Sequence, residues 1–257
     1  YQWNMDIFGI EGVTAEAELL AAITTFFQRL GFTAQDVGIK VSNRKVLQSI
    51  VTNLGVAPEH FASVCVLVDK LEKLPREAIE SSLAEYGMSP ESIDQLIAAG
   101  SITSVDELES LLGADDPAVI DLRELFNLAE GYGYVEWLQL DTSVVRGLAY
   151  YTGTVFEAFD RAGKLRAICG GGRYDTLLST YGGQDIPACG FGFGDVTIVE
   201  LLKEKGRMPT LTQGIDDMVF AFGSGERAAA ADIGQKLRAQ GRSVEVILEK
   251  KKVKWAF

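Results

Sequence analysis

Three short segments in the second half of the sequence combine glycine with arginine or tyrosine. They cover residues 145–153 (VRGLAYYTG), 170–175 (GGGRYD) and 190–194 (GFGFG). Glycine weakens a strand unless a ligand or another backbone approaches closely, so three such segments between short strands predict a binding cleft. For any one segment alone, a bulge or a tight turn is the simpler interpretation.

The arginine of the first segment indicates charge stabilisation rather than proton transfer. Arg146 stands among glycines and tyrosines, and a guanidinium suits a developing negative charge. The single histidine, His60, has no serine or cysteine elbow beside it and is interpreted as structural. The run 190–194 lacks the third glycine of a dinucleotide-binding fingerprint, because Asp195 and Val196 stand at that place. No Gly-Lys-Ser/Thr follows any glycine run. Rossmann and P-loop sites are therefore disfavoured.

The composition is that of a folded protein without a general attraction to nucleic acid. Of the 257 residues 47% are apolar and 23% are charged, with a formal net charge of −12, so a nucleic acid would have to bind a local basic patch. The one dense basic stretch, at Lys250, Lys251, Lys252 and Lys254, is by itself interpreted as a solvated helix start. The three cysteines show neither zinc spacing nor an even count, which favours a reducing compartment.

Periodicity predicts the elements that position these segments. Residues 2–8 alternate apolar and polar side chains, which predicts a strand with Gln2, Asn4 and Asp6 on one face. Further strands are predicted at 37–41, 134–140, 144–148, 154–159 and 165–169. Helices are predicted at 14–30, 174–181 and 195–205, the last two flanking the glycine-rich run 189–194. The short links between the later strands favour antiparallel neighbours.

Changes of character along the chain predict four regions. Residues 1–57 and 131–210 carry the strands and the glycine segments, whereas 58–130 form short helices broken by glycine and proline, a helical insertion. Residues 215–257 begin a βαβ unit, the one indication of a parallel sheet. Because the sequence opens at Tyr1 without methionine and stops soon after a predicted strand, we expect both ends to be cut from a longer protein.

Two segments resemble the histidine-specific motifs of the histidyl-tRNA synthetases. These are residues 146–157 (RGLAYYTGTVFE) and residues 167–175 (AICGGGRYD). Residues 1–9 are similar to the end of class II motif 2, and residues 188–202 are similar to class II motif 3. The resemblance spans the chain and is strongest near these four segments.

The resemblance implies a fold and an activity. The fold would be mixed α/β (α+β), a class II synthetase antiparallel sheet with flanking helices, a helical insertion and, from Met218, the start of an α/β anticodon-binding domain. The activity would be that of a homodimeric histidine-tRNA ligase, in which the histidine carboxylate attacks the α-phosphate of ATP and the adenylate then charges tRNA(His). ATP with Mg²⁺ would be the substrate complex, with no prosthetic group, no protein-bound metal and no membrane partner.

The resemblance also assigns roles to single residues. Gln2 and Asp6 would hold the α-ammonium of histidine, and Arg146 would be the catalytic cation that neutralises the carboxylate and the α-phosphate of ATP. Tyr151 and Tyr174 would bind or pack on the imidazole. A carboxylate suits an ammonium and a guanidinium spans two anionic oxygens, so the side-chain chemistry agrees with these roles.

Further residues would complete the two subsites. Tyr150 would stand beside the histidine and is the tyrosine most readily explained as packing. The glycines of the second motif would let the backbone approach histidine, and those of motif 3 would lie at ATP: Gly170, Gly171 and Gly172 for histidine, Gly192 and Gly194 for ATP. The surface or core alternatives for these residues, such as a surface Asp6 or a salt-bridged Arg146, are the less favoured set.

The sequence departs from the family pattern at two positions. Ala149 stands where the family commonly has aspartate, and Thr197 stands where motif 3 usually has the arginine that grips the γ-phosphate. Motif 1 and the motif 2 arginine should precede Tyr1, so we expect this segment alone not to form adenylate. The compartment would be the cytoplasm, a mitochondrion or a plastid, because a targeting segment would also precede Tyr1.

Two alternatives to the ligase remain. A synthetase-like regulator could sense histidine or uncharged tRNA without catalysis; Thr197 favours it, whereas Gln2, Asp6 and Arg146 together disfavour it. The second alternative is a purely structural interaction module. Histidine binding would distinguish it from the ligase and from the regulator, because a structural module would not bind histidine.

Overall fold

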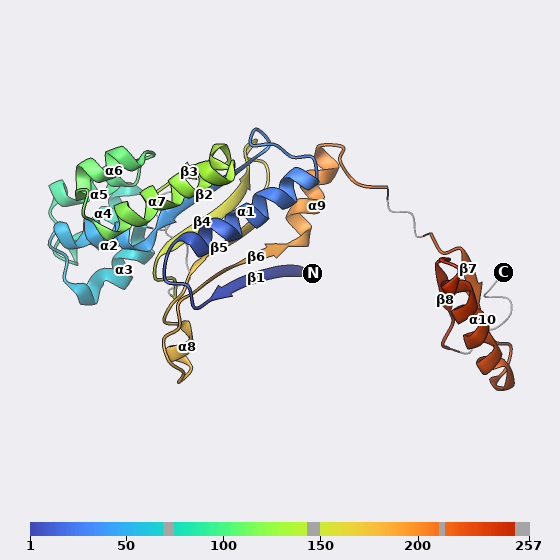
Figure 1. Ribbon diagram of the computed structural model, residues 1–257. Coiled ribbons are helices and arrows are strands. Elements are labelled where there is room, and N and C mark those ends of the chain that lie inside the picture. Colours follow the sequence, from blue (N-terminus) through green and yellow to red (C-terminus); the bar gives the residue numbers. More distant parts are fainter. Residues whose placement is uncertain (69–74, 143–149, 211–213, 250–257) are drawn as a thin grey trace. The chain divides into compact units, whose positions relative to one another are not determined.

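The computed structural model of the chain describes residues 1–68, 75–142, 150–210 and 214–249. The chain divides into two compact units, Tyr1–Met208 and Pro209–Phe257, which are described separately (Figure 1). The finer division into four regions stays a prediction.

A six-stranded sheet forms the centre of the first unit. In spatial order its strands are β1 (Gln2–Phe8), β6 (Ala188–Gly194), β5 (Cys169–Arg173), β4 (Thr154–Asp160), β2 (Val37–Asn43) and β3 (Leu138–Leu140). Neighbouring strands among these are antiparallel except β2 and β3, which are parallel. The predicted mixed fold with an antiparallel sheet is confirmed. The prediction that parallel pairing occurs only in residues 215–257 was wrong, since β2 and β3 are also parallel. The helical segment between them is long enough to return the chain in the same direction.

Helix α1 (Thr14–Arg29) packs against one face of this sheet (Figure 1). Its Leu19, Ile23 and Phe27 recur at helical spacing and are fully buried. The indole of Trp3 in β1 meets the ring of Phe26 at 5.4 Å between centroids, on the same side of the sheet. Trp3, Met5 and Ile7 therefore face the helix, and Gln2, Asn4 and Asp6 lie on the opposite face.

Short helices fill the connection between β2 and β3. They are α2 (Arg44–Asn53), η1 (Pro58–His60), α3 (Phe61–Val68), α4 (Arg76–Ala84), α5 (Pro90–Ala99), α6 (Val105–Leu112), α7 (Pro117–Tyr132) and η2 (Val135–Trp137). Serine caps begin two of them: Ser89 accepts a hydrogen bond from the Ser92 amide at 3.1 Å, and Ser104 accepts one from the Glu107 amide at 3.1 Å. Fully buried residues such as Ile79 show that the apolar positions of these helices serve packing.

Two more helices flank β6, namely α8 (Leu177–Thr180) and α9 (Asp195–Glu204). The second unit holds β7 (Asp217–Val219), η3 (Ser224–Glu226), α10 (Arg227–Ala239) and β8 (Val244–Val246). Strands β7 and β8 pair in parallel, as the βαβ prediction requires. In the described part of the chain no helix is long and apolar enough to cross a membrane.

Candidate functional site

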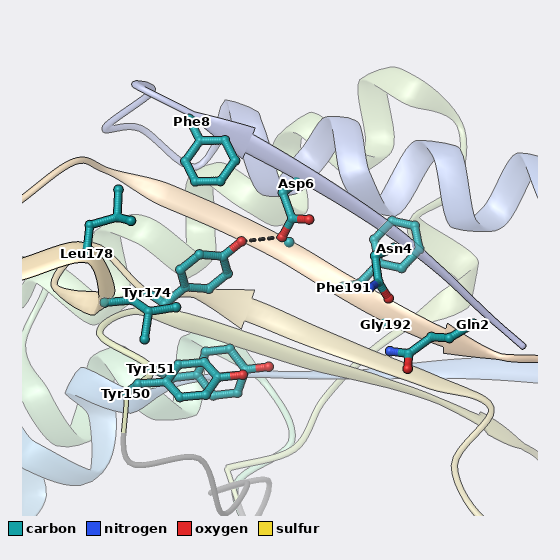
Figure 2. Close-up of a pocket in the computed structure, with 12 residues that line it drawn as sticks. Gln2, Asn4, Asp6, Phe8, Tyr150, Tyr151, Tyr174, Leu178, Phe191 and Gly192 are labelled. Atoms are coloured by element: carbon teal, nitrogen blue, oxygen red, sulfur yellow. Dashed lines mark hydrogen bonds between the residues drawn. The ribbon is translucent and has the colours of Figure 1, made fainter. Parts of the chain in front are cut away.

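The polar residues of β1 line a pocket of about 370 Å³ on the face of the sheet away from α1. Gln2, Asn4 and Asp6 all contribute to it, as Figure 2 shows, because alternate residues of a strand point to the same side. Asn4 lies between Asp6 and Gln2 along β1 in Figure 2, so the carboxylate of Asp6 and the side-chain amide of Gln2 occupy different parts of the pocket wall.

Glycines form the floor beside this polar wall. In the strand register Asp6 pairs with Gly190 and Asn4 pairs with Gly192, and both glycines line the pocket. Residues paired across adjacent strands share a face of the sheet. The missing side chains therefore leave a depression next to β1 rather than a flat sheet surface.

Two glycines of β6 are required by the polar side chains that lean over them. A Cβ on Gly190 would lie 2.0 Å from Oδ1 of Asp6 and 2.8 Å from the hydroxyl of Tyr174. A Cβ on Gly192 would lie 2.3 Å from Nε2 of Gln2. Any larger residue at either position would displace these polar groups.

The remaining predicted glycines have other neighbours. A Cβ on Gly171 would lie 2.1 Å from the carbonyl oxygen of Gly190, so this glycine allows the close approach of β5 and β6. A Cβ on Gly172 would lie 3.1 Å from Cδ1 of Tyr151, and one on Gly194 would meet nothing within 4 Å. Gly170, Gly171, Gly172 and Gly194 are not among the residues that line the pocket.

Three tyrosines enclose the pocket on the side opposite to Gln2. The ring of Tyr150 lies 4.7 Å from that of Tyr151 and 6.0 Å from that of Tyr174, the latter at an interplanar angle of 90°. Tyr150 thus joins the two other tyrosines at the pocket. The predicted residues Gln2 and Asp6 and the three tyrosines are brought together by segments up to 172 residues apart in the chain.

Asp6 and Tyr174 form a polar pair inside this aromatic group. The hydroxyl of Tyr174 donates a hydrogen bond to Oδ1 of Asp6 (Figure 2). Burial and the neighbouring carboxylate raise the pKa of Tyr174 above its ordinary value, so the hydroxyl stays protonated and donates. The second carboxylate oxygen of Asp6 is suited to accept an N–H of a ligand that stacks against the rings.

Two predictions concern cations. Arg146 lies in the segment 143–149, outside the described residues, as do Lys250, Lys251, Lys252 and Lys254. Thr197 is a buried residue of α9. A buried hydroxyl cannot supply the charge that an arginine would bring to this position.

Sequence reasoning left out several residues that the structure brings to the site. Pocket-lining residues outside the predicted set are Asn4, Phe8, Leu177, Leu178, Gly190 and Phe191. The strand alternation already placed Asn4 with Gln2 and Asp6. Behind the pocket, Arg173 forms a buried ion pair with Glu16. Glu16 lies on the same apolar face of the helix as Ile23 and Phe27. A carboxylate on an apolar helix face indicates a buried charge that needs a partner, and this signal was present in the sequence.

Comparison with known proteins agrees with this architecture. The chain is 56% identical over 257 residues to the chloroplastic/mitochondrial histidine–tRNA ligase of Arabidopsis thaliana, covering 100% of the chain and 53% of the relative. It is 37% identical over 255 residues to the histidine–tRNA ligase of Opitutus terrae, covering 97% of the chain and 58% of the relative. The crystal structure of histidyl-tRNA synthetase from Nostoc sp. PCC 7120 superposes with a TM-score of 0.73 at 25% identity, over 100% of this chain and 63% of that chain.

The chain thus spans little more than half the length of these curated relatives. The family model described as "Histidyl-tRNA synthetase" matches residues 1–195, about three quarters of the chain. The chain belongs to the histidyl-tRNA synthetase family.

Proposed function

We propose that this chain supplies the histidine pocket of a histidine-tRNA ligase. The enzyme activates histidine with ATP to histidyl-adenylate and transfers the histidyl group to tRNA(His). The relatives from Arabidopsis thaliana and Opitutus terrae, 56% and 37% identical to the chain, both carry the ligase name, which favours this function over a regulator without catalysis.

The pocket's combination of one carboxylate with three phenol rings is the observation that carries the proposal. Histidine is a flat aromatic ring with N–H groups, joined to an ammonium and a carboxylate. Asp6 accepts N–H donors of such a ligand, and the amide of Gln2 accepts from the ammonium at the other part of the wall. The rings of Tyr150, Tyr151 and Tyr174 offer faces for the imidazole.

The chemistry that follows binding needs a cation at the carboxylate. As the histidine carboxylate attacks the α-phosphate, two anionic groups come together, and pyrophosphate leaves. We assign their neutralisation to Arg146, because a guanidinium can bridge two anionic oxygens. Mg²⁺ would enter with the phosphates of ATP, and we assign Gly192 and Gly194 to the ATP subsite.

The larger assembly follows from the same assignment. Residues 58–130 form the helical insertion between the two parts of the catalytic core, 1–57 and 131–210, and residues 215–257 begin the anticodon-binding domain. The enzyme acts as a homodimer on tRNA(His). The 56% identity to a chloroplastic/mitochondrial ligase supports a mitochondrion or a plastid as its compartment.

The test is histidine-dependent exchange of pyrophosphate into ATP, measured on the protein at the length of its curated relatives. We expect exchange that requires histidine and is lost in the Arg146→Ala variant. Histidine binding by that variant, measured by calorimetry, should be weakened but not abolished, because Gln2, Asp6 and the three tyrosines remain. A well-folded protein that binds histidine but never exchanges pyrophosphate would support the regulator instead.

A further inference from the structure

A buried ion pair lies directly behind the pocket. The Arg173 side chain is 6% exposed and that of Glu16 is 0% exposed. Nε of Arg173 donates to Oε1 of Glu16 at 2.6 Å, and Nη2 donates to Oε2 at 2.6 Å, a two-pronged arrangement. Burying two charges is costly unless their geometry is good and their remaining donors are satisfied.

The remaining donors of Arg173 reach three other groups. Nη1 donates to the carbonyl oxygen of Ile10 at 2.9 Å and to Oδ1 of Asp175 at 3.1 Å. Nη2 also donates to the carbonyl oxygen of Gly12 at 2.9 Å. A guanidinium has five N–H donors, so each has a partner here. Burial alone would lower the pKa of Arg173, but the hydrogen bonds and charge of Glu16 outweigh it and raise the pKa.

This guanidinium holds two segments that each carry one member of the Asp6–Tyr174 pair. Arg173 is the last residue of β5, and the next residue, Tyr174, turns into the pocket. The carbonyl groups of Ile10 and Gly12 belong to the connection that follows β1, the strand of Asp6.

Asp175 links Arg173 to strand β6 as well. Its Oδ1, which accepts from Arg173, also accepts from the amide of Ala188 at 3.1 Å. Ala188 begins the strand that carries Gly190, over which Asp6 and Tyr174 meet. Arg173 and Asp175 therefore connect β5 to the segment after β1 and to the start of β6, at the end where the Asp6–Tyr174 pair lies.

We propose that Arg173, held by Glu16, is a positioning residue that sets the Tyr174 hydroxyl and the Asp6 carboxylate in the geometry that binds substrate histidine. This inference rests on the proposed function of the pocket. It assigns to two residues outside the pocket a share of its affinity for histidine.

The test compares histidine binding by the protein at the length of its curated relatives and by its variants Arg173→Lys and Glu16→Gln, measured by calorimetry. Lysine keeps the charge but cannot form the two-pronged contact, and glutamine keeps the shape but loses the charge. Each variant should weaken histidine binding about tenfold, since one charge-assisted hydrogen bond to the ligand is misplaced. With ¹³C-labelled tyrosine, the Cζ signal of Tyr174 should shift in both variants, which reports the altered bond to Asp6.

Controls separate positioning from general loss of stability. Arg123→Lys makes the same chemical change at an exposed pair with Asp106, and should leave binding and the Tyr174 signal unchanged. Leu96→Ala removes buried volume in α5 and should lower Tm without weakening binding comparably. Asp175→Asn keeps the inference testable if Arg173→Lys fails to fold, and should also weaken binding.

The outcomes are distinguishable. A wild-type chain that binds no histidine contradicts the proposed function itself. A wild-type chain that binds histidine, with Glu16→Gln and Asp175→Asn binding equally well, overturns the positioning role alone. Equal weakening in Leu96→Ala would overturn it as well, because any loss of stability would then have the same effect.

Discussion

The hydroxyl of Tyr174 donates a hydrogen bond to the carboxylate of Asp6 directly above Gly190, a residue without a side chain to separate them. Tyr174 follows β5 and Asp6 belongs to β1, and β6 lies between these strands. Two polar groups from non-adjacent strands can meet only because the strand between them carries glycine at this position. The pair thus depends on three segments at once.

Gly190→Ala tests this arrangement. The new Cβ would lie 2.0 Å from Oδ1 of Asp6 and would separate the carboxylate from the hydroxyl. We expect calorimetry to show histidine binding weakened by roughly tenfold, since the carboxylate that accepts from the ligand is displaced. Gly131→Ala in α7 is the matched control, because a Cβ there meets nothing within 4 Å. Unchanged binding in Gly190→Ala would show that the pair is not used.

Tyr174→Phe isolates the hydroxyl. The substitution keeps the ring that meets Tyr150 but removes the donor to Asp6. We expect histidine binding to weaken by about three- to tenfold, the usual consequence of losing one hydrogen bond. The free energy of unfolding in urea should change by only about 1 kcal/mol. Binding equal to that of the wild type would count against the role of the hydroxyl.

Asp36 should contribute stability that depends on pH. Burial opposes its ionisation, but hydrogen bonds from Arg207 and Thr33 outweigh this and lower the pKa of the Asp36 carboxyl from 3.8 to about 2. A lowered pKa stabilises the folded state above the unfolded value and loses this effect as the pH falls through the folded value. Asp36→Asn should therefore cost about 1 kcal/mol at neutral pH, discounted for solvent screening.

The measurement for Asp36 is urea unfolding of both proteins between neutral pH and about pH 2. The difference in unfolding free energy should be constant above about pH 4 and should shrink below it, towards the folded pKa of about 2. Asp94→Asn, which removes an exposed ion pair to Arg76, should have little effect throughout. A difference that grows as the pH falls would contradict the assignment.

The thiols of Cys169 and Cys189 should resist alkylation in the folded chain. Burial raises the pKa of each thiol to about 12, and both side chains are buried within the sheet. The reactive thiolate is therefore scarce and shielded at mildly alkaline pH. Peptide mass spectrometry after iodoacetamide should find both unmodified in the native chain and modified in urea. Modification of Cys189 in the native chain would show that β6 opens.

Strand and helix bounds were predictable where side chains alternate clearly. The strand at 2–8 has the predicted bounds, and the predicted helix at 195–205 is α9, Asp195–Glu204. The predicted strand at 165–169 is displaced, since β5 runs over Cys169–Arg173. The glycines of β5 give no alternation of apolar and polar side chains from which a strand could be predicted. They are needed because the adjacent strand β6 approaches closely: a Cβ on Gly171 would lie 2.1 Å from the carbonyl oxygen of Gly190. The same lack of pattern concealed β6.

The candidate site was predictable only in part. Alternation along β1 was enough to group Gln2, Asn4 and Asp6 on one face. The tyrosines entered through the family resemblance, since nothing local shows that residues this far apart share a pocket. The pairing of Arg173 with Glu16 joins residues separated by 157 positions, and only the folded sheet reveals it.

A crystal of the chain soaked with histidine tests the central claim most directly. We predict density for the amino acid in the pocket of Gln2, Asp6 and Tyr151, with an N–H of the ligand within hydrogen-bonding distance of the Asp6 carboxylate. Histidine bound elsewhere, or an empty pocket at millimolar histidine in a lattice that leaves the pocket open, would contradict the assignment of this pocket to histidine.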